Sequence, residues 1–167
     1  MGENKEKELK NPPEKSERGR TNTMIEQDTI RLLRECDAGI KMGITSIRDS
    51  AKFVRDESFK GILERSLTAH EEIKEKLQKL LDVYHDDGKE PAAMAKGMEW
   101  FKTNVTLAVD PSDDAVADFI TDGCNMGVKS LSRYLNQYAA ADEKSKDISK
   151  RLVREEEQLA VDIRRYL

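Results

Sequence analysis

The chain has 167 residues, enough for one domain with a substantial hydrophobic core. Charged residues make up 37% of it, but the two signs nearly balance and the net charge is only −4. A pI near 5.4 argues against a nucleic-acid-binding surface, and apolar runs of a few residues are too short to span a membrane. Two cysteines and a polar N-terminal stretch are typical of a cytoplasmic protein.

The first 21 residues differ in composition from the rest of the chain. They are rich in charge, contain Pro12-Pro13 and have almost no apolar side chains. Such a segment buries too little surface to offset the entropy cost of ordering it. The sequence therefore predicts a disordered charged tail over residues 1–21 and a single helical domain over residues 22–167.

A capping-box pattern marks the start of the first predicted helix, because Thr23 is followed three residues later by Glu26. Apolar and small residues then recur every three or four positions as far as Val54, which predicts a helix over residues 23–54. The break at residues 55–57 is short. A break of this length places the next helix antiparallel to the first.

The second predicted helix has the most regular inward stripe in the chain. Its spacings alternate between four and three residues, and its members are Phe59, Leu63, Ser66, His70, Ile73, Leu77, Leu80 and Tyr84. We expect the helix to end near Asp86, with Gly88 as the left-handed residue that stops it. Because His70 lies on the stripe, we expect it to be buried, whereas His85 should be exposed at the helix end.

The remainder of the chain predicts a connection and a second hairpin. Residues 91–109 carry an irregular apolar stripe and are predicted to form a short connecting helix. Asp110-Pro111-Ser112 starts a third long helix, and a break near residues 141–142 precedes the last one. The predicted fold is all-α: a four-helix bundle of two antiparallel helical hairpins, joined by a crossover that contains a short helix.

A short repeat indicates that the two hairpins arose by internal duplication. The segment Cys36–Lys41 recurs as Cys124–Lys129, each time in the first helix of a hairpin. We expect both cysteines to be buried free thiols, with a disulfide or thiolate site as the alternative. Four glycines, each costing roughly 1 kcal/mol relative to alanine, predict close helix packing or room for a large neighbour such as Tyr134, Tyr138 or His70. They are Gly39, Gly43, Gly123 and Gly127.

This layout resembles the ferritin-like superfamily, and more narrowly its small bacterial members that are grouped as domains of unknown function. The resemblance covers residues 22–167 and rests on the layout and on the repeated Cys-x-x-Gly-[Ile/Val]-Lys. It implies a ferritin-like bundle; in the di-iron members, two helices each supply Glu and two each supply Glu-x-x-His. Here Leu67 stands three residues before His70 in place of that Glu, and the last helix has no histidine. Standard ferroxidase chemistry is therefore not expected.

What remains of the pattern is a set of candidate metal ligands. Aligning Ile73 with Leu159 places Glu156 opposite His70 in the repeat. Residues 155–157 are all Glu and cannot all face solvent; the stripe count favours Glu155, and then Glu156, as the inward side chain. The alternative is a structural core histidine that bonds to one carboxylate or backbone group. The candidate metal ligands are His70, Glu35, Glu71, Glu155 and Glu156.

The missing ligands favour a non-catalytic bundle that acts through self-association or a protein partner, with no nucleic acid, membrane or cofactor. The sequence also lacks a nucleophile constellation and a phosphate-binding glycine loop. The alternative is a degenerate bundle that binds iron, manganese or zinc, or a redox bundle, centred on His70. Four residues of the connecting segment either cover the bundle or form a dimer contact: Met94, Met98, Trp100 and Phe101.

Overall fold

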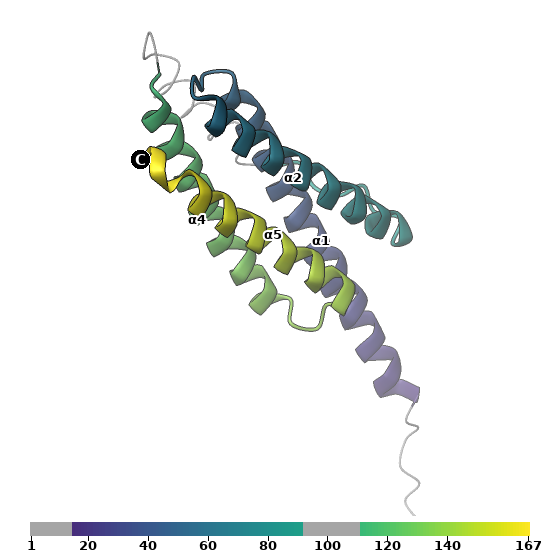
Figure 1. Ribbon diagram of the computed structural model, residues 1–167. Coiled ribbons are helices and arrows are strands. Elements are labelled where there is room, and N and C mark those ends of the chain that lie inside the picture. Colours follow the sequence, from purple (N-terminus) through teal and green to yellow (C-terminus); the bar gives the residue numbers. More distant parts are fainter. Residues whose placement is uncertain (1–14, 92–110) are drawn as a thin grey trace, which may run out of the picture.

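The computed structural model describes residues 15–91 and 111–167. In these ranges four helices form a bundle, and a short 3-10 turn, η1 (Arg164–Tyr166), follows the last of them (Figure 1). The helices are α1 (Lys15–Ala51), α2 (Glu57–Val83), α4 (Asp113–Gln137) and α5 (Glu143–Ile163). The predicted all-α four-helix bundle is confirmed. The predicted connecting helix lies outside the described residues, except for residue 91.

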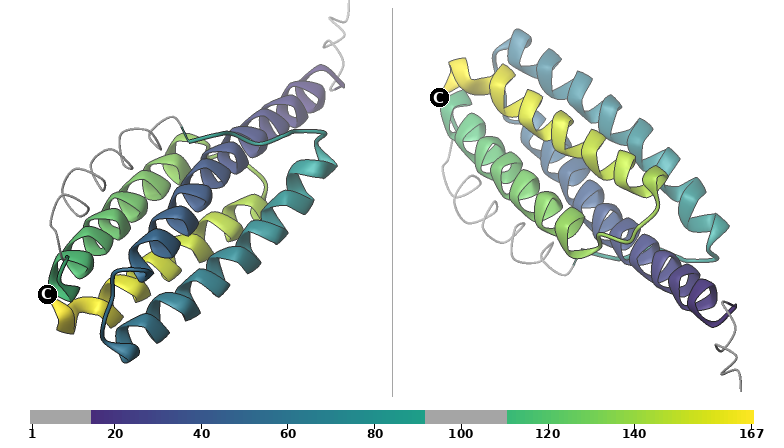
Figure 2. Two further views of the ribbon diagram at one scale, coloured as in Figure 1. Left: turned by 90° about the horizontal axis from the view of Figure 1, so that it is seen from above. Right: turned by 90° about the horizontal axis from the view of Figure 1, so that it is seen from below.

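The helices are arranged as two antiparallel hairpins placed side by side (Figures 1 and 2). α1 and α2 form one hairpin, α4 and α5 form the other, and the hairpins meet through α2 against α5 and α1 against α4. The starts of α2 and α4 lie at the same end of the bundle as the C-terminus. In the described ranges, no helix combines the length and the hydropathy that a membrane span requires.

α1 starts earlier than the sequence predicts, at Lys15 rather than at residue 23. Thr23 does not cap the helix, because its hydroxyl donates to the carbonyl of Gly19 one turn earlier, at 2.9 Å. Residues 15–21, assigned to the tail in the sequence prediction, are therefore helical, and residues 1–14 lie outside the described ranges. The first turns of α1 project beyond the bundle, and the side chains of residues 17–24 are exposed (Figure 2).

The end of α2 also differs from the prediction. The helix stops at Val83, and the residue in the left-handed conformation is His85, with φ +52°, rather than Gly88 alone. The amide of His85 donates to Asp82 O, and the amide of Asp86 donates to Leu81 O, at 3.1 Å each. This pair of bonds is the Schellman motif, which satisfies the last carbonyls of a helix. His85 is exposed, as predicted.

The left-handed backbone at His85 predicts a stabilising substitution. His85→Gly should raise the free energy of unfolding by roughly 0.5–1 kcal/mol, because glycine adopts this conformation without a Cβ clash. Urea denaturation measures the change. Asp87→Gly is the matched control, because Asp87 does not have a positive φ and gains only unfolded-state freedom from the substitution. Equal effects of the two substitutions would contradict the prediction.

The buried side chains form two apolar clusters, one in each half of the bundle. The first contains Leu32, Leu33, Cys36, Ile40, Ile44, Ile73, Leu77, Leu81, Leu131, Ala141, Ile148 and Leu152. The second contains Ile47, Val54, Phe59, Ile62, Leu63, Val116, Ala117, Ile120, Cys124, Leu159 and Ile163. On every helix the change from one cluster to the other falls near the same level. That level is occupied by Gly43, His70, Gly127 and Glu156.

Beyond α2, residues 84–91 cross the outer face of α1 (Figure 2). Arg34 pairs with Asp86 and Lys41 with Glu90, each at 2.6 Å. Asp37 lies beneath this segment with 0% of its surface exposed, and its Oδ2 accepts from the amide of Lys89 at 2.9 Å. These contacts hold residues 84–91 against α1.

The two hairpins share features at equal distances from the starts of their second helices. Asp56 and Asp142 cap α2 and α5, each accepting from the amide three residues later. In the next turn Lys60 pairs with Glu57 at 2.7 Å, and Lys146 pairs with Glu143 at 3.3 Å. The buried positions of α5 also fall at the same distances from its cap as seven of the buried positions of α2. Counting from the caps therefore brings His70 and Glu156 to equivalent places.

Candidate functional site

His70 and Glu156 form a buried polar contact at the centre of the bundle. His70 is 0% exposed and Glu156 is 9% exposed, and His70 Nε2 lies 3.3 Å from Glu156 Oε1. The other ring nitrogen, Nδ1, donates to the backbone carbonyl of Ser66 at 2.8 Å. A carbonyl oxygen can only accept, so Nδ1 carries a proton and Nε2 faces the carboxylate. This confirms the predicted burial of His70 and brings it together with one of its four candidate partners.

The surroundings of His70 favour its charged form. Burial alone would lower the pKa of His70, but the hydrogen bond and charge of Glu156, the carbonyl of Ser66 and the charge of Glu155 outweigh it and raise the pKa. α1 places Gly43 at this level, and α4 places Gly127 there and, next to Glu156, the thiol of Cys124. The pair is therefore a buried imidazole–carboxyl contact between two apolar clusters, in which folding favours the charged form of His70.

This arrangement predicts a pH dependence of stability. A histidine whose pKa is raised by folding stabilises the protein fully below its unfolded pKa, near 6.5, and loses that contribution as pH rises through the folded pKa. The free energy of unfolding should therefore fall as pH increases above about 6.5. Urea denaturation across this range should show a shallower fall in Glu156→Gln, which lacks the carboxylate charge.

His85→Gln provides the control for that series, because His85 is the other of the two histidines and is exposed. Its pH dependence should match that of the wild type. A fall of equal steepness in Glu156→Gln and in the wild type would show that the pair does not cause it.

Two glycines provide the space that the pair occupies. A Cβ on Gly43 would lie 3.3 Å from His70 Cδ2, and a Cβ on Gly127 would lie 3.3 Å from the carboxyl carbon of Glu156. Larger residues at either position would press on a buried side chain. Among the described residues, no atom lies within 4 Å of a Cβ built on Gly39 or Gly123, so these two glycines do not make room for the central pair.

This geometry also corrects the spatial meaning of the sequence repeat. The repeat aligns Gly39 with Gly127, but only Gly43 and Gly127 face the central pair. Cys36 and Cys124, which the repeat also aligns, belong to different core clusters. By its place at the central pair, Gly43 of α1 therefore corresponds to Gly127 of α4, and Gly39 to Gly123, which is four residues away from the alignment that the motif indicates.

The remaining candidate ligands lie elsewhere. Glu35 is half-buried and pairs with Lys89 at 2.7 Å. Glu71 is on the surface and pairs with Arg48 at 2.9 Å. Glu155 is half-buried, so the predicted order of the two glutamates is wrong: Glu156, four residues from Leu152 and three from Leu159, is the inward one.

A di-iron centre does not fit this donor set. In the described ranges, no three or more His, Cys, Asp or Glu side chains come together in a group that could hold a metal ion. The central pair supplies one imidazole and one carboxylate, whereas a di-iron bundle uses four carboxylates and two imidazoles.

Both cysteines are buried free thiols, as predicted. Burial raises the pKa of Cys36 to about 12. Burial and the adjacent Glu156 raise the pKa of Cys124 well above its usual range. Because the thiolate is the reactive form, both side chains are protonated and weakly reactive at neutral pH.

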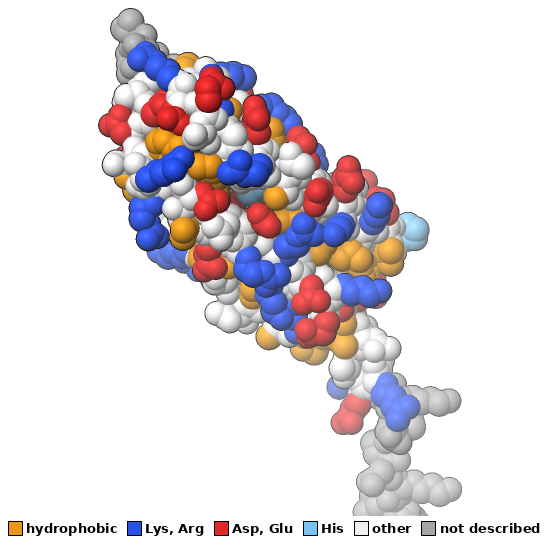
Figure 3. Space-filling view, viewed as in Figure 1, with side chains coloured by type: hydrophobic (Ala, Val, Ile, Leu, Met, Phe, Trp, Pro, Cys, Tyr) orange, Lys and Arg blue, Asp and Glu red, His pale blue; other side chains and the backbone are white. Residues whose placement is uncertain are grey.

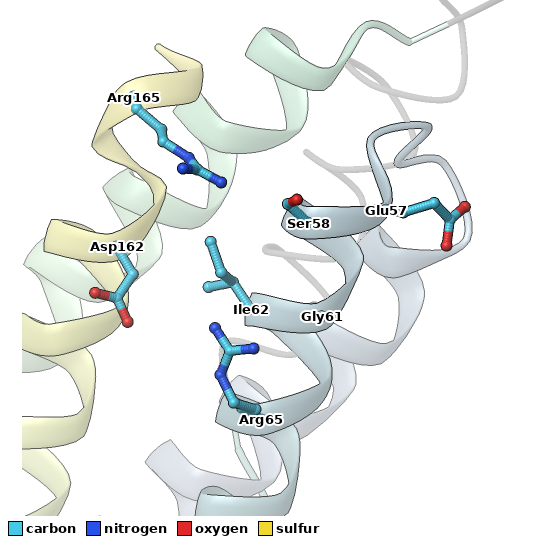
Figure 4. Close-up of a pocket in the computed structure, with 7 residues that line it drawn as sticks. All are labelled: Glu57, Ser58, Gly61, Ile62, Arg65, Asp162 and Arg165. Carbon is cyan, nitrogen blue, oxygen red and sulfur yellow. The ribbon is translucent and has the colours of Figure 1, made fainter.

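The face formed by α2 and α5 carries charged side chains of both signs (Figure 3). It contains a cavity of about 450 Å³ between the first turns of α2 and the end of α5, lined on opposite sides by Arg65 and Arg165 (Figure 4). These two arginines were not predicted from the sequence, because an exposed arginine has no periodic signature. Comparing the two hairpins from their N-cap aspartates would have distinguished Arg65 from its counterpart.

Comparisons with protein-family models, with curated proteins and with solved structures each found no match to this chain. The family resemblance is thus supported only at the level of a four-helix all-α bundle.

Proposed function

We propose that the protein is a non-catalytic helical bundle that acts by contacting another protein chain, either a second copy or a different partner. The observation that supports this proposal is that the first turns of α1 project beyond the bundle. They continue well past the other helices, and Met24 at their end nearest the bundle is 60% exposed. The hydroxyls of Thr21 and Thr23 bond only to carbonyls of their own helix.

A free-standing helix of this composition is intrinsically weak. Glycine, threonine and asparagine are poor helix formers, and the segment includes Gly19, Thr21, Asn22 and Thr23. Isolated helices shorter than about 12–15 residues are marginal in water. Contact with another chain would stabilise the projecting turns, which is why we assign the contact to them. The exclusion of solvent from His70 supports the non-catalytic part of the proposal.

A photo-crosslinking residue in place of Met24 tests the contact in cells that make the full chain. We expect a discrete cross-linked species, whose mass and peptide composition identify a second copy or another protein. The same residue in place of Val161 is the control, because Val161 is 52% exposed on the body of the bundle. No species at position 24, or the same species at both positions, would reject the proposal.

The parallel directions of α2 and α4 support a ferritin-like arrangement of the hairpins, since only a connection along the bundle can join such helices. The matching caps, salt bridges and buried positions support an internal duplication. We therefore propose that the bundle has a ferritin-like shape and arose by internal duplication, without ferroxidase chemistry. The two buried thiols are compatible with a reducing cytoplasm.

The alternative function is a metal-binding bundle, and one contact favours it. His70 donates from Nδ1 to a backbone carbonyl and directs Nε2 at a carboxylate, an orientation that metal-binding histidines share. Elemental analysis of protein purified without chelators tests it. Stoichiometric iron, manganese or zinc that disappears in His70→Ala would replace the non-catalytic proposal, and a metal-free wild type would eliminate the alternative.

A further inference from the structure

The cavity beside Arg65 lies between the two hairpins, where α2 packs against α5. Its volume is about 450 Å³, within the range of small-ligand sites. A smaller hollow of about 90 Å³ adjoins it and shares Ile62, Arg65 and Asp162. Together they form a groove between α2 and α5.

Two guanidinium groups border this cavity from opposite sides. Arg65 reaches it from α2 and Arg165 from η1, with Ile62 between them (Figure 4). Arg65 has no hydrogen bond or ion pair with any described residue. Arg165 donates to the hydroxyl of Tyr166 at 2.6 Å, and the charge of Asp56 acts on it at longer range.

The position of Arg165 is set by its neighbour. The ring of Tyr166 stacks on Phe59 with centroids 4.4 Å apart, and its hydroxyl donates to Asp56 at 3.1 Å. These contacts join the C-terminal turn to the start of α2. They hold Arg165 at the edge of the cavity, so that its guanidinium group is positioned before any ligand binds.

The acidic side chains that line the cavity are already engaged. Asp162 accepts a hydrogen bond from Gln158 at 2.7 Å, and Glu57 pairs with Lys60 at 2.7 Å. The carboxylate of Glu57 also points away from the arginines (Figure 4). Lys60 therefore offsets Glu57, and Asp162 is the acidic lining residue that remains beside the two arginines.

The second hairpin supplies an internal comparison. Arg65 and Arg151 both lie nine residues after the aspartate that caps their helix. Arg151 pairs with Glu72 of the opposite hairpin at 3.3 Å. The residue equivalent to Glu72 on α5 is Gln158, which carries no charge. Arg151 thus has a carboxylate partner across the interface, whereas Arg65 faces the side-chain amide of Gln158 and the cavity.

From this difference we infer that the cavity is a binding site for an oxyanion, the phosphate or carboxylate group of a small ligand. Guanidinium groups bind both kinds of group through paired N–H donors, and two of them border this cavity. The oxyanion of the ligand then pairs with Arg65, as the carboxylate of Glu72 pairs with Arg151. This site is separate from the contact through α1, and neither proposal depends on the other.

The test uses the full chain labelled with ¹⁵N and titrated with sodium phosphate or sodium acetate at constant ionic strength. We expect saturable shifts of the Gly61 and Ile62 amides with at least one of the two ions. Arg65→Gln should weaken that binding at least tenfold. Gln158→Glu should do the same, because it supplies the carboxylate that Arg151 already has. Saturation by phosphate alone, acetate alone or both identifies the group that the site accepts.

Arg151→Gln is the matched control and should bind like the wild type, since its guanidinium is already paired with Glu72. Thermal unfolding without added ligand checks that each variant is folded. The inference fails if neither ion binds saturably, if Arg65→Gln binds as well as the wild type, or if Arg151→Gln weakens binding as much as Arg65→Gln does.

Discussion

A chain in which the two central residues are exchanged, H70E/E156H, should retain most of the wild-type stability, although each single substitution is strongly destabilising. His70→Glu places two carboxylates side by side in the core and should cost about 3–5 kcal/mol of unfolding free energy. Glu156→His leaves two buried imidazoles and should cost about 2–3 kcal/mol. The exchange restores one carboxyl group and one imidazole, so the coupling should recover most of the roughly 5–8 kcal/mol that the two single substitutions lose together.

The two places are interchangeable because each has its own glycine. Gly43 leaves room on α1 for the side chain at position 70, and Gly127 leaves room on α4 for the side chain at position 156. Urea denaturation near pH 6 of the wild type, both single variants and the exchange measures the coupling as a double-mutant cycle. A double variant that loses the sum of the two single effects would show that the places are not equivalent.

The exposed pair Arg48–Glu71 gives the control for this cycle. Both side chains are about half exposed, at 54% and 50%, and their atoms lie 2.9 Å apart. The exchange R48E/E71R and its single variants should each change stability by less than about 1 kcal/mol, because solvent screens such pairs. The difference between the two cycles isolates the effect of burial.

The central pair was partly predictable from the sequence. The stripe through α2 predicts that His70 faces the core, and the 4-3 alternation that identifies it is confirmed through Leu77. Aligning Ile73 with Leu159 already places Glu156 opposite His70. The preference for Glu155 fails because the inward face of α5 is a narrow stripe: one position along a helix rotates a side chain by about 100°.

Other features leave no periodic signal in the sequence. The burial of Asp37 depends on the path of residues 84–91 across α1, which no helix pattern encodes. The left-handed residue at the end of α2 is His85 although Gly88 is the better candidate by type, because the helix ends where its stripe leaves the core. Gly127 lies beside Glu156 only at one axial offset between α4 and α5, and no sequence motif defines that offset.

The contacts that hold residues 84–91 against α1 predict the second large effect on stability. Gly88→Ala should lower the free energy of unfolding by about 2–4 kcal/mol. The φ of Gly88 is +79°, where a Cβ is strained. The Cβ would also overlap Asp37 Oδ2 and lie 2.9 Å from its Cγ and 3.2 Å from Leu81 Cδ1.

Asp37 has little freedom to move away from the added methyl group. Its Oδ2 accepts from the amide of Lys89 and from Lys41 Nζ, at 2.9 Å each, and the residue is 0% exposed. Displacing it would leave a buried carboxylate with fewer partners, which is costly in addition to the backbone strain. Its Oδ1 has no hydrogen-bond partner in the described ranges, so the two bonds to Oδ2 are the main compensation for its burial.

Urea denaturation measures the loss, and Gly123→Ala serves as the control. Gly123 lies inside α4, and no described residue has an atom within 4 Å of its added Cβ, so alanine there should stabilise the protein by roughly 0.5–1 kcal/mol. Amide hydrogen exchange provides a second readout. In Gly88→Ala the amide of Lys89 should lose protection while amides of α4 and α5 keep theirs, because only the fastening to α1 is broken. An unchanged Lys89 amide together with unchanged stability would show that Asp37 does not hold this segment.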